Sequence, residues 1–180
     1  PLFAHPSNLR GVEIAVEHGV SVLAHVAADD RKVWDDTLVK KMVAHNVALI
    51  PTLKLHFWDL RSVGLSTDNN PLTVTAIRQL ETFHKGGGLV IFGTDVGYMD
   101  DYDIEEELVQ MQNAGMGFDQ ILAALTSNPA HKFNLSKKTG TISIGKNADL
   151  VILNKNPALA IQHLTTVYMT ILNGIIIFVQ

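Results

Sequence analysis

The sequence predicts an α/β fold, with a parallel sheet and its helices over residues 1–138 and a small β appendage over residues 139–180. Two observations support this prediction. Short apolar runs alternate with helical patterns until about residue 135, which is typical of parallel strands joined by helices. After that point the helical periodicity ends, and short apolar runs follow one another around Asn173-Gly174.

The first half of the chain carries start and stop signals for two helices between strands. Asn8 can cap the first helix, and Gly19 can provide its left-handed end. Asp35 or Asp36 opens the second helix, and Asn46 ends it. The strands expected around these helices are residues 1–4, 20–24 and 47–50.

Residues 54–70 interrupt this rhythm. They contain aromatic residues, Gly64 and the pair Asn69-Asn70, so we expect a long loop that covers a site. A helix follows over residues 72–85, and the run Gly86-Gly87-Gly88 ends it before a strand at residues 89–94. Because this glycine run follows a helix and opens a strand, it does not fit a phosphate-binding loop.

Two further helices and four short strands complete the prediction. The helices are expected at residues 104–115 and 119–125, and the strands at residues 141–144, 150–153, 165–172 and 175–179. Asn173-Gly174 between two apolar runs is a strong hairpin signal. We therefore expect a small antiparallel sheet at this end.

Composition limits the classes of function. The 180 residues are 47% hydrophobic and 18% charged, which is typical of a globular chain with a core. A net charge of −4 without a basic run argues against nucleic acid as a partner, and no apolar stretch is long enough for a membrane span. The absence of cysteine excludes thiolate metal sites but leaves the compartment open between cytoplasm and periplasm or secretion. The chain begins in an expected strand without an initiator Met, so we expect upstream sequence.

Three polar residues each close an apolar run and open a loop. They are His5, His25 and Asp95. Because the carboxyl ends of parallel strands share one face of a sheet, we expect these side chains to converge. Two imidazoles and a carboxylate suit a divalent metal such as zinc. Thr52, His56, Trp58 and Tyr98 also follow expected strand ends and are candidates for a substrate pocket.

Five segments of the chain resemble the carboxyl-terminal half of the amidohydrolase superfamily, and its imidazolonepropionase-like and prolidase-like members above all. These segments are His5-Pro6-Ser7-Asn8, Val22-Leu23-Ala24-His25, Leu49-Ile50-Pro51-Thr52-Leu53, Phe92-Gly93-Thr94-Asp95 and residues 139–152. The resemblance implies strands five to eight of a TIM-type (β/α)8 barrel, followed by strands of a composite β-sandwich. It also implies that the family's first-strand His-x-His pair and its fourth-strand carboxylated Lys lie outside this sequence.

The resemblance further implies roles for the three residues. His5 would ligate one or two divalent metal ions, with Zn²⁺ as the expected metal. His25 would be a second ligand or would hydrogen-bond the attacking water. Asp95 would be a ligand and the general base in hydrolysis of a C–N bond in an amide, a cyclic amide or a dipeptide. The upstream half of the barrel is the expected partner, and apolar strand faces left uncovered predict self-association.

Alternatives remain open at this stage. The chain is either part of an active hydrolase, a catalytically silent half with an incomplete metal site, or part of a deaminase of the same superfamily. From the residues alone, a histidine at a strand end is more often structural than a ligand, and Gly-Thr-Asp is a common turn composition. His18, His45 and His84 lie near expected helix ends, where a structural role is favoured.

Overall fold

The computed structural model describes residues 1–180, which form two compact units, Pro1–Met116 and Gly117–Gln180. The predicted domain boundary at residue 138 concerns the superfamily's barrel and sandwich, and it stays a prediction. None of the helices combines the length and the apolar composition that a membrane crossing needs.

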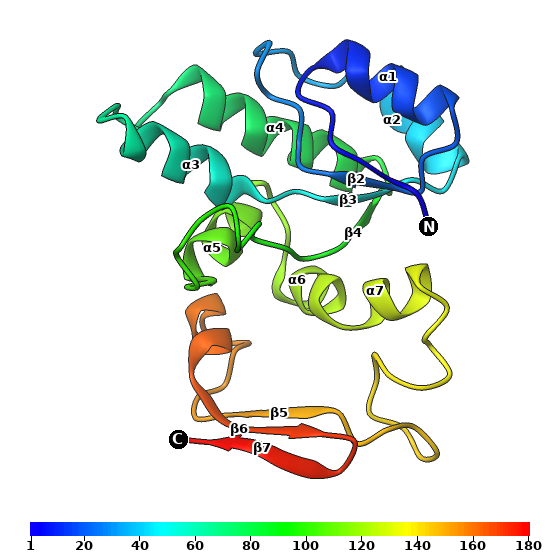
Figure 1. Ribbon diagram of the computed structural model, residues 1–180, viewed down its shortest axis with the longest axis vertical. Helices are drawn as coiled ribbons and strands as arrows, with labels where there is room; N and C mark the ends of the chain where they lie inside the picture. Colours follow the sequence, from blue (N-terminus) through cyan, green and yellow to red (C-terminus); the bar gives the residue numbers. More distant parts are fainter. The chain divides into compact units, whose positions relative to one another are not determined.

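The first unit contains a four-stranded parallel sheet in the order β1-β2-β3-β4. The strands are β1 (Phe3–Ala4), β2 (Val22–Ala24), β3 (Ala48–Ile50) and β4 (Leu89–Val90). The helices are α1 (Leu9–Glu17), α2 (Asp36–Ala44), α3 (Leu53–Ser62), α4 (Pro71–Lys85) and α5 (Glu105–Asn113). Figure 1 shows α1, α2 and α4 on the same side of this sheet. The predicted alternation of parallel strands and helices is therefore confirmed for this unit.

Predicted capping residues start the helices of this unit. The side chain of Asn8 accepts a hydrogen bond from the amide of Gly11 at 2.9 Å, and Asp35 does the same for Leu38 at 2.8 Å. Each bond satisfies one of the amides that the first helical turn leaves without a partner. Gly19 adopts the expected positive φ of 77° after α1.

The predicted loop over residues 54–70 is wrong in its first half, because residues 53–62 form α3. Leu53, Phe57 and Leu60 are buried at helical spacing on this helix. No side chain next in sequence caps its start. The carboxylate of Glu107 accepts from the amide of Lys54 at 2.7 Å instead. A cap that comes from a residue so distant in sequence leaves no local signal.

The second unit contains two helices and a three-stranded antiparallel sheet in the order β5-β6-β7. Its elements are α6 (Phe118–Leu125), α7 (Ser127–Lys132), β5 (Leu150–Leu153), a 3-10 helix (Ile161–Thr165), β6 (Val167–Leu172) and β7 (Ile175–Val179). The hairpin at Asn173-Gly174 is confirmed, and both turn residues have positive φ. Pro129 lies in the first turn of α7, where its missing amide costs little.

The expected strand at residues 141–144 is absent. Ile142 and Ile144 are fully exposed, and no strand pairs with this segment. Its alternating apolar pattern alone does not make a strand, since a strand also needs a neighbour for its backbone hydrogen bonds.

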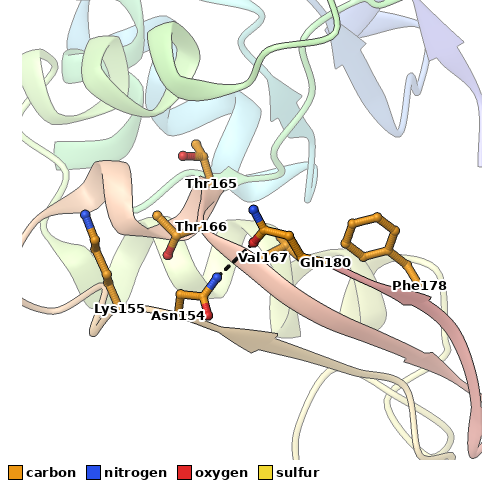
Figure 2. Close-up of a pocket in the computed structure, with 7 residues that line it drawn as sticks. All are labelled: Asn154, Lys155, Thr165, Thr166, Val167, Phe178 and Gln180. Carbon is orange, nitrogen blue, oxygen red and sulfur yellow. Dashed lines mark hydrogen bonds between the residues drawn. The ribbon is translucent and has the colours of Figure 1, made fainter.

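An open hollow of about 510 Å³ lies beside the three-stranded sheet of the second unit. Figure 2 shows its lining, which is Asn154, Lys155, Thr165, Thr166, Val167, Phe178 and Gln180. The lining contains no histidine and no carboxylate side chain. It therefore lacks the imidazole and carboxylate side chains that ligate a metal such as zinc.

Candidate metal centre

The structure brings the three predicted side chains together at one end of the parallel sheet. His5 directly follows β1 and His25 directly follows β2. The two imidazole rings meet edge to face, with centroids 4.5 Å apart. Nε2 of His25 lies 3.8 Å from Oδ2 of Asp95. β4 ends at Val90, so Asp95 reaches the site from the loop after the strand and not from the strand itself.

Hydrogen bonds to the neighbouring strand fix the position of His25. Its amide donates to the carbonyl of Ile50 at 2.8 Å. Its Nδ1 lies 2.6 Å from Oγ1 of Thr52, and that hydroxyl lies 2.9 Å from the carbonyl of Pro51. His25 and Thr52 are 7% and 2% exposed, so both side chains are enclosed by protein. Hydrogen bonds at the backbone amide and at Nδ1 therefore fix the position of the His25 imidazole.

Gly93 allows the segment before Asp95 to approach β3. A Cβ at this position would lie 2.5 Å from Cγ2 of Ile50, which is closer than carbon atoms can approach. With a larger residue at this position, the Ile50 side chain or the segment itself would have to shift. Gly93 therefore allows close packing against the Ile50 side chain.

Backbone strain gathers at the same place. Eight non-glycine residues of the chain have positive φ, and four of these are asparagines, which adopt this conformation more readily than most residues. The other four are His25 (79°), Arg31 (58°), Thr52 (45°) and Asp95 (61°). Strained residues of this kind cluster at functional sites, where the surrounding structure holds them in place. Three of the four, His25, Thr52 and Asp95, are residues that the sequence places at the candidate site.

Burial favours the neutral form of His25 and His56. Desolvation lowers the pKa of His25, the nearby carboxylate of Asp95 raises it, and His5 lowers it. Burial also lowers the pKa of His56 to about 4, with smaller contributions from His25 and Arg31. Nε2 of His56 is buried without a hydrogen-bond partner. A neutral imidazole presents a lone pair on one ring nitrogen, which is the form that ligates metals.

His25 and Asp95 fit a pair of metal ligands. Two ligand atoms that each lie about 2.0–2.2 Å from a tetrahedral zinc are roughly 3.3–3.6 Å apart. The 3.8 Å between Nε2 and Oδ2 is close to this separation and too long for a hydrogen bond. No group of three or more His, Cys, Asp or Glu side chains in the chain is arranged to hold an ion by itself.

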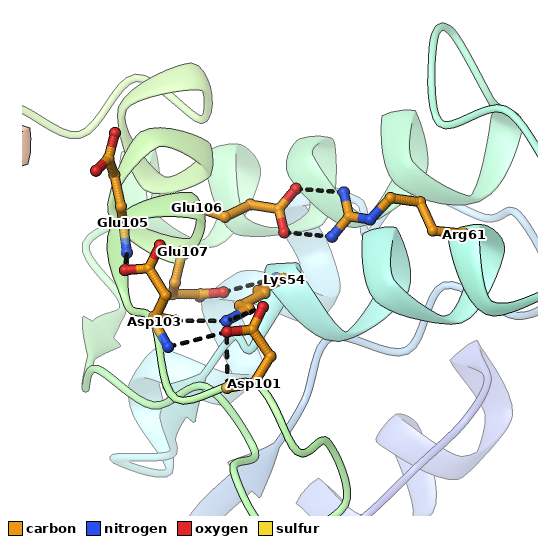
Figure 3. A network of polar contacts seen from close by, with 7 residues as sticks. All are labelled: Lys54, Arg61, Asp101, Asp103, Glu105, Glu106 and Glu107. Atoms are coloured by element: carbon orange, nitrogen blue, oxygen red, sulfur yellow. Dashed lines mark hydrogen bonds and ion pairs between the residues drawn. The ribbon is translucent and has the colours of Figure 1, made fainter.

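A buried polar network anchors the loop that follows Asp95 (Figure 3). The side chain of Lys54 is 1% exposed; it pairs with the carboxylate of Asp101 at 2.9 Å and donates to the carbonyls of Asp101 and Asp103. Glu107 is fully buried beside it and accepts from the start of α3. Thr52, which directly precedes α3, thus contacts His25. Lys54, in the first turn of α3, contacts the loop after Asp95.

The remaining pocket candidates have structural partners. Trp58 and Tyr98 pack edge to face, with centroids 5.8 Å apart, and the Tyr98 hydroxyl donates to Asp59 at 3.4 Å. Lys54 and Glu107 were missed from the sequence. A lysine within an apolar helix face was the only available signal for this network.

The chain is similar to known proteins in sequence and in fold. The chain is 28% identical over 190 aligned positions to an imidazolonepropionase of Thermoplasma acidophilum, covering 98% of this chain and 45% of that protein. It is 32% identical over 92 residues to an allantoinase of Bacillus licheniformis, covering 51% of this chain and 18% of that protein. Among solved structures, a Xaa-Pro dipeptidase with bound methionine superposes with a TM-score of 0.85 at 20% identity, covering 99% of this chain and 44% of that one.

The chain thus spans less than half the length of these relatives, and its α/β fold matches one part of an amidohydrolase structure. The model of the amidohydrolase family matches residues 9–177, which is nearly the whole chain. We conclude that the chain belongs to the amidohydrolase family.

Proposed function

We propose that this chain is the carboxyl-terminal part of a metal-dependent hydrolase of C–N bonds. The observation that carries the proposal is the convergence of His5, His25 and Asp95, with Nε2 of His25 facing Oδ2 of Asp95 at 3.8 Å. The names imidazolonepropionase, allantoinase and Xaa-Pro dipeptidase support a C–N bond in a cyclic amide or a dipeptide as the target.

We assign β1 to β4 to strands five to eight of a TIM-type barrel, and β5 to β7 to a composite sandwich. The parallel order β1-β2-β3-β4 and the helices on one side of this sheet support the assignment. Coverage of 44–45% of two of the relatives supports an upstream half that supplies the first four strands. Further metal ligands would come from that half.

A divalent metal, with Zn²⁺ as the proposed ion, lowers the pKa of water toward about 7 and polarises a substrate carbonyl when it is bound at such a centre. His5, His25 and Asp95 would hold it through imidazole nitrogens and a carboxylate oxygen.

Asp95 is the proposed general base. Its side chain is one-third exposed, so substrate and water can reach it, while Oδ2 faces the buried His25. Oδ2 accepts a proton from the attacking water and delivers it to the leaving nitrogen. Burial lowers the pKa of His25, which favours the neutral imidazole that can ligate a metal.

The chain by itself is catalytically silent under this proposal. The observation that favours silence is the lack of a three-residue ligand set among its own side chains. Both statements hold together if the upstream half completes the centre.

The test starts from the reading frame upstream of residue 1 in the source gene. We expect it to encode a His-x-His pair at a first strand end and a Lys or Glu at a fourth. The extended protein should bind zinc and hydrolyse dipeptides or cyclic amides. Asp95→Asn should reduce kcat by 10²-fold or more while zinc stays bound, because general acid–base catalysis typically contributes 10²–10⁴-fold.

Asp68→Asn is the matched control, because Asp68 lies on an exposed loop and its side chain makes no hydrogen bond. An extended protein without zinc and without hydrolysis would contradict the proposal. Release of ammonia from an aminated ring, in place of ring opening, would redirect it to a deaminase.

A further inference from the structure

Thr52 occupies a backbone conformation that its residue type disfavours. It has φ 45° and ψ 49°, the left-handed region, and its branched Cβ makes this region costly. Threonine at the residue before a helix ordinarily caps that helix with its hydroxyl. Thr52 makes no such cap. The structure therefore holds Thr52 in an unfavourable state without the usual local benefit.

A distant residue takes over the capping role at the start of α3. Oε2 of Glu107 accepts from the amide of Lys54 at 2.7 Å. Because Glu107 satisfies this amide, the Thr52 hydroxyl is free to face elsewhere. It lies 2.6 Å from Nδ1 of His25.

Only one placement of the protons allows Thr52 to bond both His25 and the carbonyl of Pro51. A threonine hydroxyl has a single hydrogen, and the carbonyl of Pro51 at 2.9 Å can only accept it. The hydroxyl oxygen must then accept from Nδ1–H of His25. A neutral imidazole has one ring proton, so Nε2 carries the lone pair, and Nε2 is the atom that faces Asp95.

We propose that Thr52 is a positioning residue that holds the His25 imidazole with its proton on Nδ1 and the lone pair of Nε2 toward Asp95. This inference rests on the proposed metal centre for its purpose, but its claim about the proton is independent of any metal. Partners that fix the tautomer of a ligand histidine typically change metal affinity by 10–100-fold when they are removed.

The experiment compares two substitutions of Thr52 with a matched threonine elsewhere. Thr52→Val keeps the branched shape and removes the hydroxyl, and Thr52→Ser restores it. Thr73→Val is the control, because Thr73 is equally buried and its hydroxyl lies 3.1 and 3.0 Å from the carbonyls of Thr67 and Asn70, both before α4. A loss of stability alone would affect both valine variants.

The first readout is the ¹⁵N NMR spectrum of the His25 ring in the metal-free 180-residue chain. We expect a protonated Nδ1 and an unprotonated Nε2 in the wild type, in Thr52→Ser and in Thr73→Val. Thr52→Val should show a mixture of tautomers. An unchanged spectrum in Thr52→Val, or the same mixture in Thr73→Val, would overturn the proposal.

The second readout is zinc affinity, measured by chelator competition in the protein extended upstream. Thr52→Val should bind zinc 10–100-fold more weakly, and Thr52→Ser should stay within about threefold of the wild type. Equal affinity in Thr52→Val and the wild type would overturn the link to the metal. A tautomer shift in a protein that binds no zinc would support the role of Thr52 and contradict the proposed function, so the two failures are distinguishable.

Discussion

The start of α3 buries polar and charged side chains, whereas β7 leaves aliphatic side chains in solvent. Lys54 and Glu107 are 1% and 0% exposed. Ile175 and Ile177 are 67% and 58% exposed, and every other residue of β7 is exposed as well. Each region thus reverses the ordinary distribution of residue types between interior and surface.

The two reversals have different physical meanings. A buried charge is costly unless hydrogen bonds and opposite charges surround it, so its presence near Thr52 and the loop after Asp95 indicates that position matters there more than stability. Contact between water and a large apolar patch is unfavourable, so such a patch indicates a surface that another protein surface covers. Lys54 and Glu107 have polar partners within the chain, whereas the side chains of β7 face solvent.

The largest expected effect concerns the stability of the first unit as a function of pH. Burial raises the pKa of Glu107 to about 8 from an ordinary value of 4.5. The folded state therefore binds this proton more tightly than the unfolded state, and stability is lost as the pH rises from about 4.5 to about 8. The loss is on the order of 4 kcal/mol, since one unit of pKa corresponds to about 1.4 kcal/mol. Urea unfolding between pH 5 and pH 8.5 measures it.

Glu107→Gln separates this group from the others that titrate in the same range. The amide keeps the shape and the acceptor for the amide of Lys54 but stays neutral, so the variant should lose less stability on alkalinisation than the wild type. Glu105→Gln on the same helix is the control and should leave the dependence unchanged. If the free energy of unfolding changed equally with pH in Glu107→Gln and in the wild type, the Glu107 carboxyl would not be the cause of the pH dependence.

The next effect concerns the exposed sheet of the second unit. We expect the 180-residue chain to self-associate through β7, because adjacent apolar side chains on an exposed strand favour contact with another chain. The double substitution Ile175→Thr and Ile177→Thr keeps branched side chains suited to a strand and should weaken self-association by about tenfold or more. Sedimentation velocity over a range of concentrations measures the change.

Ile176→Thr with Phe178→Thr changes the opposite face of the same strand and identifies which face associates. A chain that sediments as a monomer at all concentrations would remove the second half of the comparison. In that case, exposed aliphatic residues on β7 would not mark a surface that needs a partner.

The sequence predicted the parts of the fold whose signals are local. Asn8 and Asp35 cap the helices that they were expected to cap, and Asn173-Gly174 forms the expected hairpin. The prediction was wrong where the deciding contact is distant. The carboxyl group of Glu107 on α5 caps the start of α3, and no residue near Thr52 in the sequence indicates this contact.

The same distinction applies to the candidate site. The convergence of His5, His25 and Asp95 followed from their places after strands, and the structure brings them together. The hydrogen bond from His25 to Thr52 could not be predicted, because it depends on a positive φ that threonine rarely adopts. Strain of this kind is visible only in three dimensions.

The smallest expected effect sharpens the comparison within the first unit. Arg61 on α3 and Glu106 on α5 form a two-point ion pair, with distances of 2.7 and 2.6 Å, next to the buried Lys54 network (Figure 3). Their side chains are 46% and 25% exposed, so water and salt screen the attraction. A double-mutant cycle of Arg61→Met and Glu106→Gln should give a coupling of about 0.5–1 kcal/mol in urea unfolding, and less at high salt. A coupling as large as the Glu107 effect would mean that pairing geometry, and not burial, decides how strongly charges join these two helices.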